Sequence, residues 1–450
     1  MRTFLTIVLL TAVSCLLPAQ EGTDSVTAVI RDVQTGEPIP YANVYVSPSC
    51  GTISNADGEF ALLCHPTDTL RISCIGYQRI TYTAAELPAI INMKPIAWMM
   101  QELTVMGADD ILYHLVKKMM KEARRQRKKE SRYFFRLYTR YPGTDELAET
   151  FMSAKSCVQL RDITFHSGNR GILTEKNTLD DRASLTGLGR TNMHDFLRLS
   201  PMLVNYDIWD MAFVPADKVL RRIRNLYDVS CSTYKEDDGT EICKIHMTGN
   251  PGVYASRSIL NGTLFVDKKR CRLLRFDGEV MGLWMGLYDQ ARERRYVTPV
   301  QYTMHMDFRH DHGFTEIANI SGTLTKDSVS VRLLLFNFGD KELKFNKAVR
   351  VHGNMVQSID EVGFDSTLWA LTGIVKRTRD EERVAFGDST YRSPNKTPYN
   401  SVAASEQEQR SNQYLRDAMR QLMDGSMPLR RGPMQKREYG VPPLTIKWRN

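Results

Sequence analysis

The sequence lacks the short motifs that mark the common enzyme classes. None of its nine histidines begins a His-x-x-Glu or His-Glu-x-x-His arrangement, so no zinc-peptidase ligand set is visible. A Gly-x-Ser-x-Gly nucleophile elbow and a phosphate-binding glycine loop are also missing. "FGDST" around Ser389 echoes one esterase motif, but no Asp-x-x-His follows it. We therefore predict that the protein is not an enzyme, and we name no catalytic residue, cofactor or metal ligand.

Long hydrophobic runs are absent after the N-terminus. The run at residues 4–17 follows a basic residue, ends at Pro18 and Ala19, and is too short to span a bilayer. These features predict a signal peptide over residues 1–19 and an exported protein without a transmembrane helix, in the periplasm or at the outer membrane. Cleavage before Cys15 is the alternative, because "AVSC" resembles a weak lipobox and would give a lipid anchor.

Neither sign of charge is in large excess, since the formal net charge is +8. The positive charge is concentrated in residues 117–132, which carry nine Lys or Arg on a segment with helical apolar spacing. We expect a basic amphipathic linking helix over residues 108–132. It has two interpretations: a patch for anionic lipid headgroups or an acidic partner, and a solvated helix face. Nucleic acid is not expected as a partner, since the run has no interleaved aromatic residues.

Cysteine is sparse, with eight residues, of which seven remain if Cys15 leaves with the signal. Cys231 and Cys243 flank a segment that turns near Asp238 and Gly239, so a hairpin would bring them together as a disulfide. Three others fall in the first eighty residues of the exported chain, where any pair could be bridged or all could be buried: Cys50, Cys64 and Cys74.

Residues 25–107 read as short strands with turns at regular intervals, which is typical of a small β-sandwich. "GTISNADGEFAL" at residues 51–62 predicts a hairpin in which Asp57 and Gly58 make the tight turn. Asn55 and Asp57 are expected to bond to nearby backbone amides, and Phe60 to face the core. Asn55, Asp57 and Glu59 could also bind calcium by ligand type, a weaker interpretation than the turn.

Four ordered motifs in this segment resemble the carboxypeptidase regulatory-like domain, a transthyretin-like β-sandwich common in surface proteins of the Bacteroidetes. They are "TAVIRDVQTGEPIPYANVYV", "TISNADGEFAL", "LRISCIGYQ" and "QELTVMG". The matching positions that shape the fold are Gly36, Asp57, Gly58, Phe60, Gly76 and Tyr77. The resemblance implies an accessory module that carries no catalytic residues.

Residues 133–384 predict a larger antiparallel β-rich (α+β) domain of unknown function. Within it, helical patterning appears only at residues 191–211, so we expect a sheet curled around a helix there. Residues 385–450 predict a polar linker, a short helix and a tail. The order of elements is loosely similar to the periplasmic part of outer-membrane proteins that carry this first domain. The densest ligand-capable group is a hairpin tip containing Asp307, His310, Asp311 and His312, which we interpret as exposed polar residues rather than a metal site.

The fold class expected is therefore mainly β, a sandwich followed by a larger antiparallel domain. The function expected is a non-catalytic accessory protein of the cell envelope whose partner is an envelope protein, a surface polymer or a lipid. Two alternatives stay open: an unrecognised hydrolase or metal-dependent enzyme, and a lipid carrier or membrane-inserted barrel. The sequence does not fix the oligomeric state.

Overall fold

The structure is a computed structural model of the whole chain. It describes residues 24–47, 50–96, 108–125, 128–141, 144–155, 161–174, 225, 227–236, 238–249, 259–289, 294–311, 314–326, 329–337, 339, 344–351, 355–371 and 375–386. The expected signal peptide, the expected helix at 191–211, Ser389 and the tail lie outside these residues. In the described part of the chain, no helix combines the length and the apolar character needed to cross a membrane.

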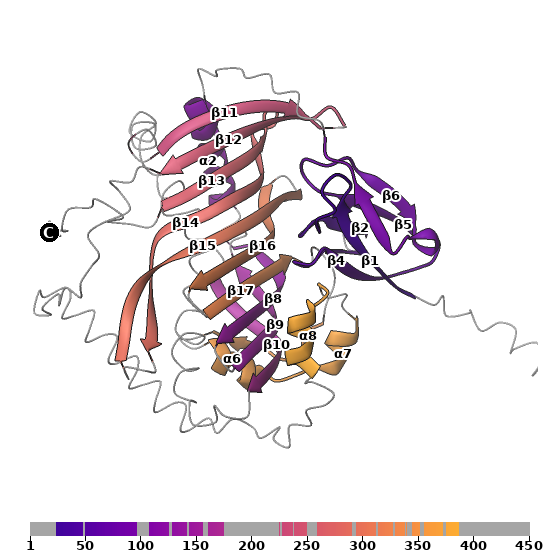
Figure 1. Cartoon of the computed structure of the whole chain (residues 1–450), viewed down its shortest axis with the longest axis vertical. Helices are drawn as coiled ribbons and strands as arrows, with labels where there is room; N and C mark the ends of the chain where they lie inside the picture. The colour runs from indigo at the N-terminus through magenta and orange to yellow at the C-terminus, as the bar shows by residue number, and fades with distance from the viewer. Residues whose placement is uncertain are drawn as a thin grey trace, which may run out of the picture.

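The first domain is a sandwich of two small sheets, which confirms the fold expected for it (Figure 1). One sheet has the order β4 (Glu59–Cys64), β1 (Asp24–Asp32), β7 (Ile90–Met93). The other has the order β3 (Cys50–Ile53), β2 (Asn43–Ser47), β5 (Thr69–Ser73), β6 (Ile80–Thr83), followed by the 3-10 turn η1 (Ala84–Glu86). Alternate residues of each strand face a shared apolar core that includes Ile30, Val44, Phe60, Ile72 and Ile91.

The second domain is built on one antiparallel sheet of eleven strands. Its order is β11 (Tyr227–Lys235), β12 (Glu241–Gly249), β13 (Ile259–Asp267), β14 (Arg272–Asp289), β15 (Arg294–Asp311), β16 (Phe314–Lys326), β17 (Val329–Asn337), β8 (Glu130–Tyr141), β9 (Thr144–Lys155), β10 (Arg161–Thr174), β18 (Val349–Arg350). Because β17 pairs with β8, the start of the domain lies in the middle of the sheet. That pairing joins segments nearly two hundred residues apart.

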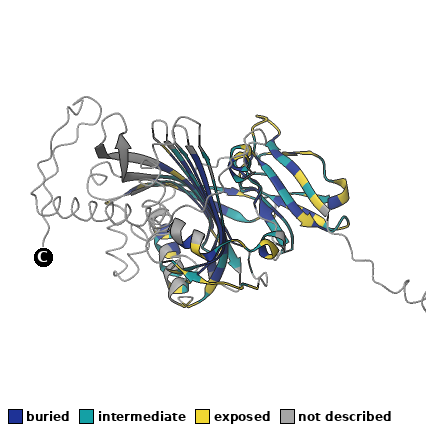
Figure 2. Ribbon diagram, turned by 90° about the horizontal axis from the view of Figure 1, so that it is seen from below, coloured by how far each residue is buried: buried dark blue, intermediate teal, exposed yellow. Residues whose placement is uncertain are grey.

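Both faces of this sheet are covered, and neighbouring residues of β8 show the division. Tyr133 and Phe135 belong to the apolar cluster of α2 (Ala108–Arg125) and α6 (Met355–Val362). Phe134, between them, packs with α7 (Ser366–Leu371) and with Ile53 of the sandwich. Figure 2 shows the sheet edge-on as a curved layer with the sandwich beside one of its faces. The short helix α8 (Arg379–Phe386) completes the sandwich side, where Val384 packs on Tyr138.

Two details differ from the sequence expectations. The linking helix ends at Arg125 and β8 begins at Glu130, so residues 130–132 of the expected helix are strand, paired with β9. Helices α6, α7 and α8 stand in a region where the sequence shows no helical periodicity. Each of these three helices has eight residues or fewer, which is too short for the 3.6-residue period to stand out in the sequence.

The cysteines of the β11–β12 hairpin are bonded as a disulfide in the structure, with Cα atoms 6.5 Å apart. Cys231 lies opposite Ile245 and Cys243 opposite Thr233, so the two cysteines are diagonal rather than direct cross-strand neighbours. In the sandwich, Cys64 and Cys74 are buried among the core residues.

Gly58 and Gly36 form a matched pair for testing the predicted turn. Both have a positive φ, of 74° and 73°. A Cβ at Gly58 would lie 2.5 Å from the Ile30 carbonyl oxygen, whereas a Cβ at Gly36 would meet nothing within 4 Å.

We predict that Gly36→Ala lowers the free energy of unfolding by about 1 kcal/mol, the cost of a left-handed backbone for an L-residue. Gly58→Ala should cost about 1–3 kcal/mol more, because the clash adds to that strain. Urea denaturation of the two variants measures both values. Equal losses would mean that the close approach at Gly58 contributes nothing.

Candidate functional site at the interface of the two domains

The predicted turn of the sandwich is built around a buried asparagine. Asn55 Oδ1 accepts hydrogen bonds from the backbone N–H groups of Asp57 and Glu59, both at 2.9 Å. The Asn55 backbone carbonyl accepts a further one from Gly58 at 3.0 Å. Its side-chain nitrogen points away from the sandwich and donates to the carbonyl of Arg377 at 3.1 Å. One side chain therefore shapes the turn and attaches it to the second domain.

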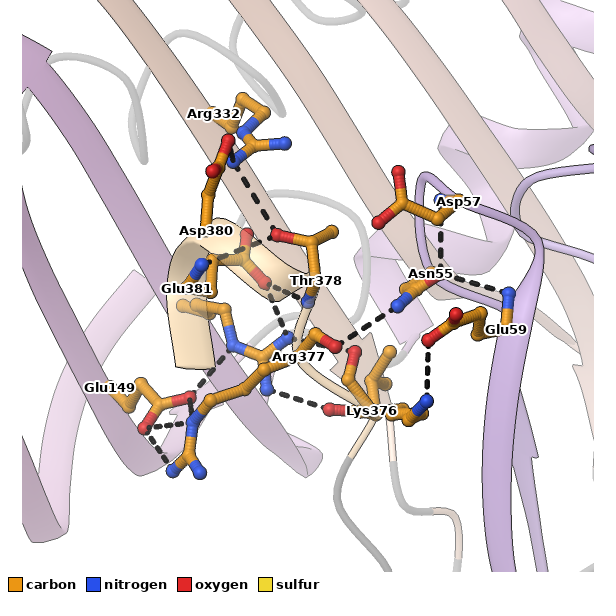
Figure 3. Close-up of polar contacts among 12 residues, drawn as sticks. Asn55, Asp57, Glu59, Glu149, Arg332, Lys376, Arg377, Thr378, Asp380 and Glu381 are labelled. Carbon is orange, nitrogen blue, oxygen red and sulfur yellow. Dashed lines mark hydrogen bonds and ion pairs between the residues drawn. The ribbon is translucent and has the colours of Figure 1, made fainter. Parts of the chain in front are cut away.

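Behind this turn lies a buried group of opposite charges (Figure 3). Glu149 on β9 has no exposed side-chain surface and accepts a hydrogen bond from Arg136 Nε on β8 at 2.7 Å. Arg377 donates to the same carboxylate through Nη2 at 2.6 Å and through Nε at 3.0 Å. Arg136 also donates to the backbone carbonyls of Val375 at 2.6 Å and Lys376 at 3.3 Å. Arg136 thereby fixes the segment whose Arg377 carbonyl receives Asn55.

The electrostatics of Glu149 follow from this burial. Removing the carboxylate from water raises its pKa, and this is the largest single effect. The charge of Arg136, together with the hydrogen bonds and charge of Arg377, outweighs it, so the pKa of Glu149 lies below its ordinary value. Glu149 is therefore an ionised structural acceptor at neutral pH, not a proton donor.

The segment continues into α8 through a capping box. Thr378 Oγ1 accepts a hydrogen bond from the Glu381 backbone N–H at 3.4 Å, and Glu381 accepts one from the Thr378 N–H at 2.9 Å. The Glu381 carboxylate also lies 3.3 Å from Arg136 Nη1. The helix start thus adds a second negative charge to the buried group.

Ionic and apolar contacts flank this group. Lys376 forms an ion pair with Glu59, which follows the sandwich turn. Ile53, fully buried, packs with Phe134 of β8 and with Trp369 of α7. A small cleft remains between the domains, lined in part by Tyr41, Asn55, Arg136, Arg332 and Thr378.

A second polar cluster lies farther along the same face of the sheet. Arg275 on β14 makes a bidentate contact with Asp307 on β15, with Nε–Oδ1 at 2.8 Å and Nη2–Oδ2 at 3.4 Å. His305 lies between two carboxylates: Nδ1 contacts Asp277 and Nε2 lies 3.1 Å from Asp307. Asn319 donates to Asp307 at 3.0 Å. Asp307 is thus held by an arginine, a histidine and an amide.

The sandwich covers this cluster too. The Tyr41 ring stacks on His305 with centroids 5.2 Å apart, and Cys74 Sγ lies 3.6 Å from Arg275 Nη1. Burial lowers the pKa of His305, but the neighbouring charge of Asp307 and the hydrogen bonds to Asp277 and Asp307 outweigh it, so the net shift is upward. His305 therefore favours the imidazolium form.

The motif residues named from the sequence all stand in the turns or core of the sandwich: Gly36, Asp57, Gly58, Phe60, Gly76 and Tyr77. The Tyr77 hydroxyl donates to Asp32 at 3.0 Å, and burial followed by this contact raises the pKa of Tyr77 to about 12. Gly76, with φ of 88°, hydrogen-bonds through its backbone to the carboxylate of Glu236 in the second domain. A motif glycine therefore also contributes to the interface.

The ligand-capable groups named from the sequence are placed differently. Asp307 faces the sandwich, whereas His310 contacts the Leu273 carbonyl and Thr315 beside α2. His312 and the side chain of Asp311 lie outside the described residues. The Asn55 oxygen is used by backbone amides, and Glu59 by Lys376. Within the described ranges, no group of three or more His, Cys, Asp or Glu side chains is arranged to hold a metal ion.

Sequence reasoning missed Arg136, Glu149 and Arg377. They come from two adjacent strands and a segment more than two hundred residues later, and no spacing connects them. The one local signal was the Thr-x-x-Glu capping box at Thr378 and Glu381, which predicts a helix start but not its partners.

We predict that Glu149→Gln lowers the free energy of unfolding by about 3–5 kcal/mol, since it leaves the buried Arg136 and the partly buried Arg377 without their shared counter-charge. Glu241→Gln is the matched control: its ion pair with Lys268 is about 40% exposed on both sides, and such pairs contribute less than about 1 kcal/mol. Urea denaturation compares the two. Similar small losses would contradict a central role for Glu149.

His305 gives a pH-dependent prediction. Because its folded-state pKa is raised above 6.5, its contribution to stability is fully present below 6.5 and is lost as the pH rises through the folded value. The excess stability of the wild type over His305→Gln should therefore shrink from neutral to alkaline pH. His166 and His310, whose pKa values are lowered, chiefly by burial, remain in both proteins and cancel. A difference that grows with pH would contradict the assignment.

Comparison with known proteins identifies the first domain. A family model described as CarboxypepD_reg-like domain matches residues 26–105. No curated protein matches the sequence. One similar solved structure is titled "Crystal structure of MucB in complex with MucA(peri)"; it has 8% identity and a TM-score of 0.16, and the match covers 51% of this chain and 93% of that chain. At that TM-score the likeness carries no argument. Residues 26–105 thus form a carboxypeptidase regulatory-like domain, as their four motifs predicted.

Proposed function

We propose that this protein is a non-catalytic accessory protein of the cell envelope, in which the regulatory-like domain and the sheet domain act as one rigid scaffold for an envelope partner. The observation that carries the proposal is the pairing of charges at the domain interface. Glu149 is shared by Arg136 and Arg377, and Asp307 by Arg275 and His305. These pairs form within the second domain and satisfy its strongest ionisable groups at the interface. The sandwich is attached to them by Asn55, which bonds to the Arg377 carbonyl, and by Tyr41, which stacks on His305.

The same pairing argues against acid–base chemistry at this interface. A general base works best with a pKa near the operating pH. The pKa values of Glu149 and Asp307 instead lie below their ordinary range, because arginine charges outweigh the effect of burial. Both carboxylates suit a permanent ion pair better than proton transfer.

The envelope location is inferred from the sequence. The first nineteen residues have the basic start, the short apolar run and the small-residue end of a secretion signal. The regulatory-like domain adds support, because its family is typical of surface and outer-membrane proteins as an accessory module.

The sandwich offers a surface for the partner. Among the described residues, three of the four exposed large apolar side chains belong to it: Val33 (52% exposed), Leu63 (39%) and Ile90 (53%). Leu63 pairs with Ser25, and Ile90 pairs with Val29. Positions 25 and 29 share one face of β1, and Val33 continues this alternation one residue beyond the strand, so Val33, Leu63 and Ile90 lie on the outer face of the β4–β1–β7 sheet.

We predict that the tagged protein fractionates with the envelope of its native host, and that a photocrosslinking residue at position 90 captures one envelope protein. Position 344, an exposed lysine in the second domain, is the control and should not capture it. Leu63→Glu should reduce capture from position 90, because it places a charge in the apolar contact.

Recovery in the cytoplasm would overturn the envelope role. Equal capture from positions 90 and 344, or no capture from position 90, would overturn the assigned partner surface.

A further inference from the structure

The fold assembles a basic surface from two segments that are far apart in the sequence. We name it the basic rim, and it consists of Lys117, Lys118, Lys121 and Arg125 of α2 with Lys268, Lys269 and Arg270 of the β13–β14 turn and Arg272 at the start of β14. Lys118 Nζ donates to the Arg270 carbonyl, which joins the helix to the turn. The sequence showed only the helical half of this surface.

The geometry of α2 separates its two faces. Leu112 and Leu115 are fully buried in the main apolar cluster of the sheet. Lys117, Lys121 and Arg125 recur every four residues and therefore form one stripe along the helix. Lys121 and Arg125 are exposed. The helix is thus anchored by its apolar face and presents a row of cations to solvent.

The acidic side chains nearest the rim already have partners. Glu122 accepts hydrogen bonds from the backbone N–H and hydroxyl of Thr315, at 2.9 Å and 2.8 Å. Asp267 pairs with Arg270 at 2.9 Å, and Lys268 pairs with Glu241. These contacts offset part of the positive charge and leave an excess carried mainly by Lys121, Arg125 and Lys269.

A neighbouring histidine lies within reach of charges from both parts of the rim. Burial is the main cause that lowers the pKa of His310; the hydrogen bond to Leu273 and the charge of Glu122 raise it, and the positive charges of Arg272 and Lys118 lower it. Charged side chains of α2 and of the start of β14 therefore lie close to the same histidine.

We propose that the basic rim is a docking surface for an anionic lipid surface. The cations stand on long side chains along a helix and a turn, so they can follow the headgroups of a lipid layer. Because the apolar face of α2 is buried in the protein, the contact is electrostatic and does not insert the helix. The proposal rests on the envelope role proposed above for its cellular setting.

Purified protein comprising residues 20–450 tests the contact by cosedimentation with vesicles. It should bind vesicles of equimolar phosphatidylglycerol and phosphatidylcholine, and not vesicles of phosphatidylcholine alone. The double variant Lys121→Glu and Lys269→Glu should weaken binding by about tenfold or more, since each basic residue near an anionic surface contributes about fivefold. Lys94→Glu with Lys344→Glu, the same charge change at exposed positions elsewhere, is the control and should bind like the wild type.

Three outcomes would overturn the proposal: equal binding to both vesicle types, equal loss in the control variant, or displacement by inorganic phosphate beyond that by sodium chloride of equal ionic strength. The last would indicate a phosphate pocket instead of a lipid surface. Unchanged thermal unfolding of both double variants separates lost binding from lost folding. Because these assays use purified protein, they can succeed when the fractionation experiment fails, and the reverse.

Discussion

The arrangement of the molecule depends on one buried carboxylate held by two arginines. Moving a charge from water into a protein interior costs several kcal/mol, so Glu149 is stable in its position only if its partners are present together. Those partners come from β8 and from the segment that begins at Val375. The strand pairing of the sheet and the path of the later segment are therefore tied to the same few atoms.

The sandwich is attached to this group through its own turn. Asn55 uses its oxygen within the turn and its nitrogen on the Arg377 carbonyl, so the conformation of the turn and the position of the domain are set by one side chain. The second cluster, with Tyr41 over His305 and Cys74 beside Arg275, fixes the other side of the contact. Two separated attachment points oppose rotation of one domain on the other.

When both faces of a sheet are covered, its strands lose the alternation of apolar and polar residues in their sequence. In β8, residues 133–138 are all buried, because odd positions face α2 and α6 while even positions face α7, α8 and the sandwich. The familiar alternation of apolar and polar residues belongs to sheets with one face in water. The sequence of residues 133–384 therefore predicts antiparallel strands, but it does not predict that the sandwich, α7 and α8 cover the second face of their sheet.

The sequence by itself determined the local features of this protein: the strands of the sandwich, the Asp57–Gly58 turn, the apolar side of α2 and the regulatory-like motifs. Each depends on residues close together in the chain, where backbone preference and side-chain periodicity act directly. Only the tertiary structure decided that β17 pairs with β8, that Glu149 meets Arg377, and that the β13–β14 turn joins the cations of α2. These contacts join distant segments, and charged residues recur too often along a chain for their types alone to specify which of them meet.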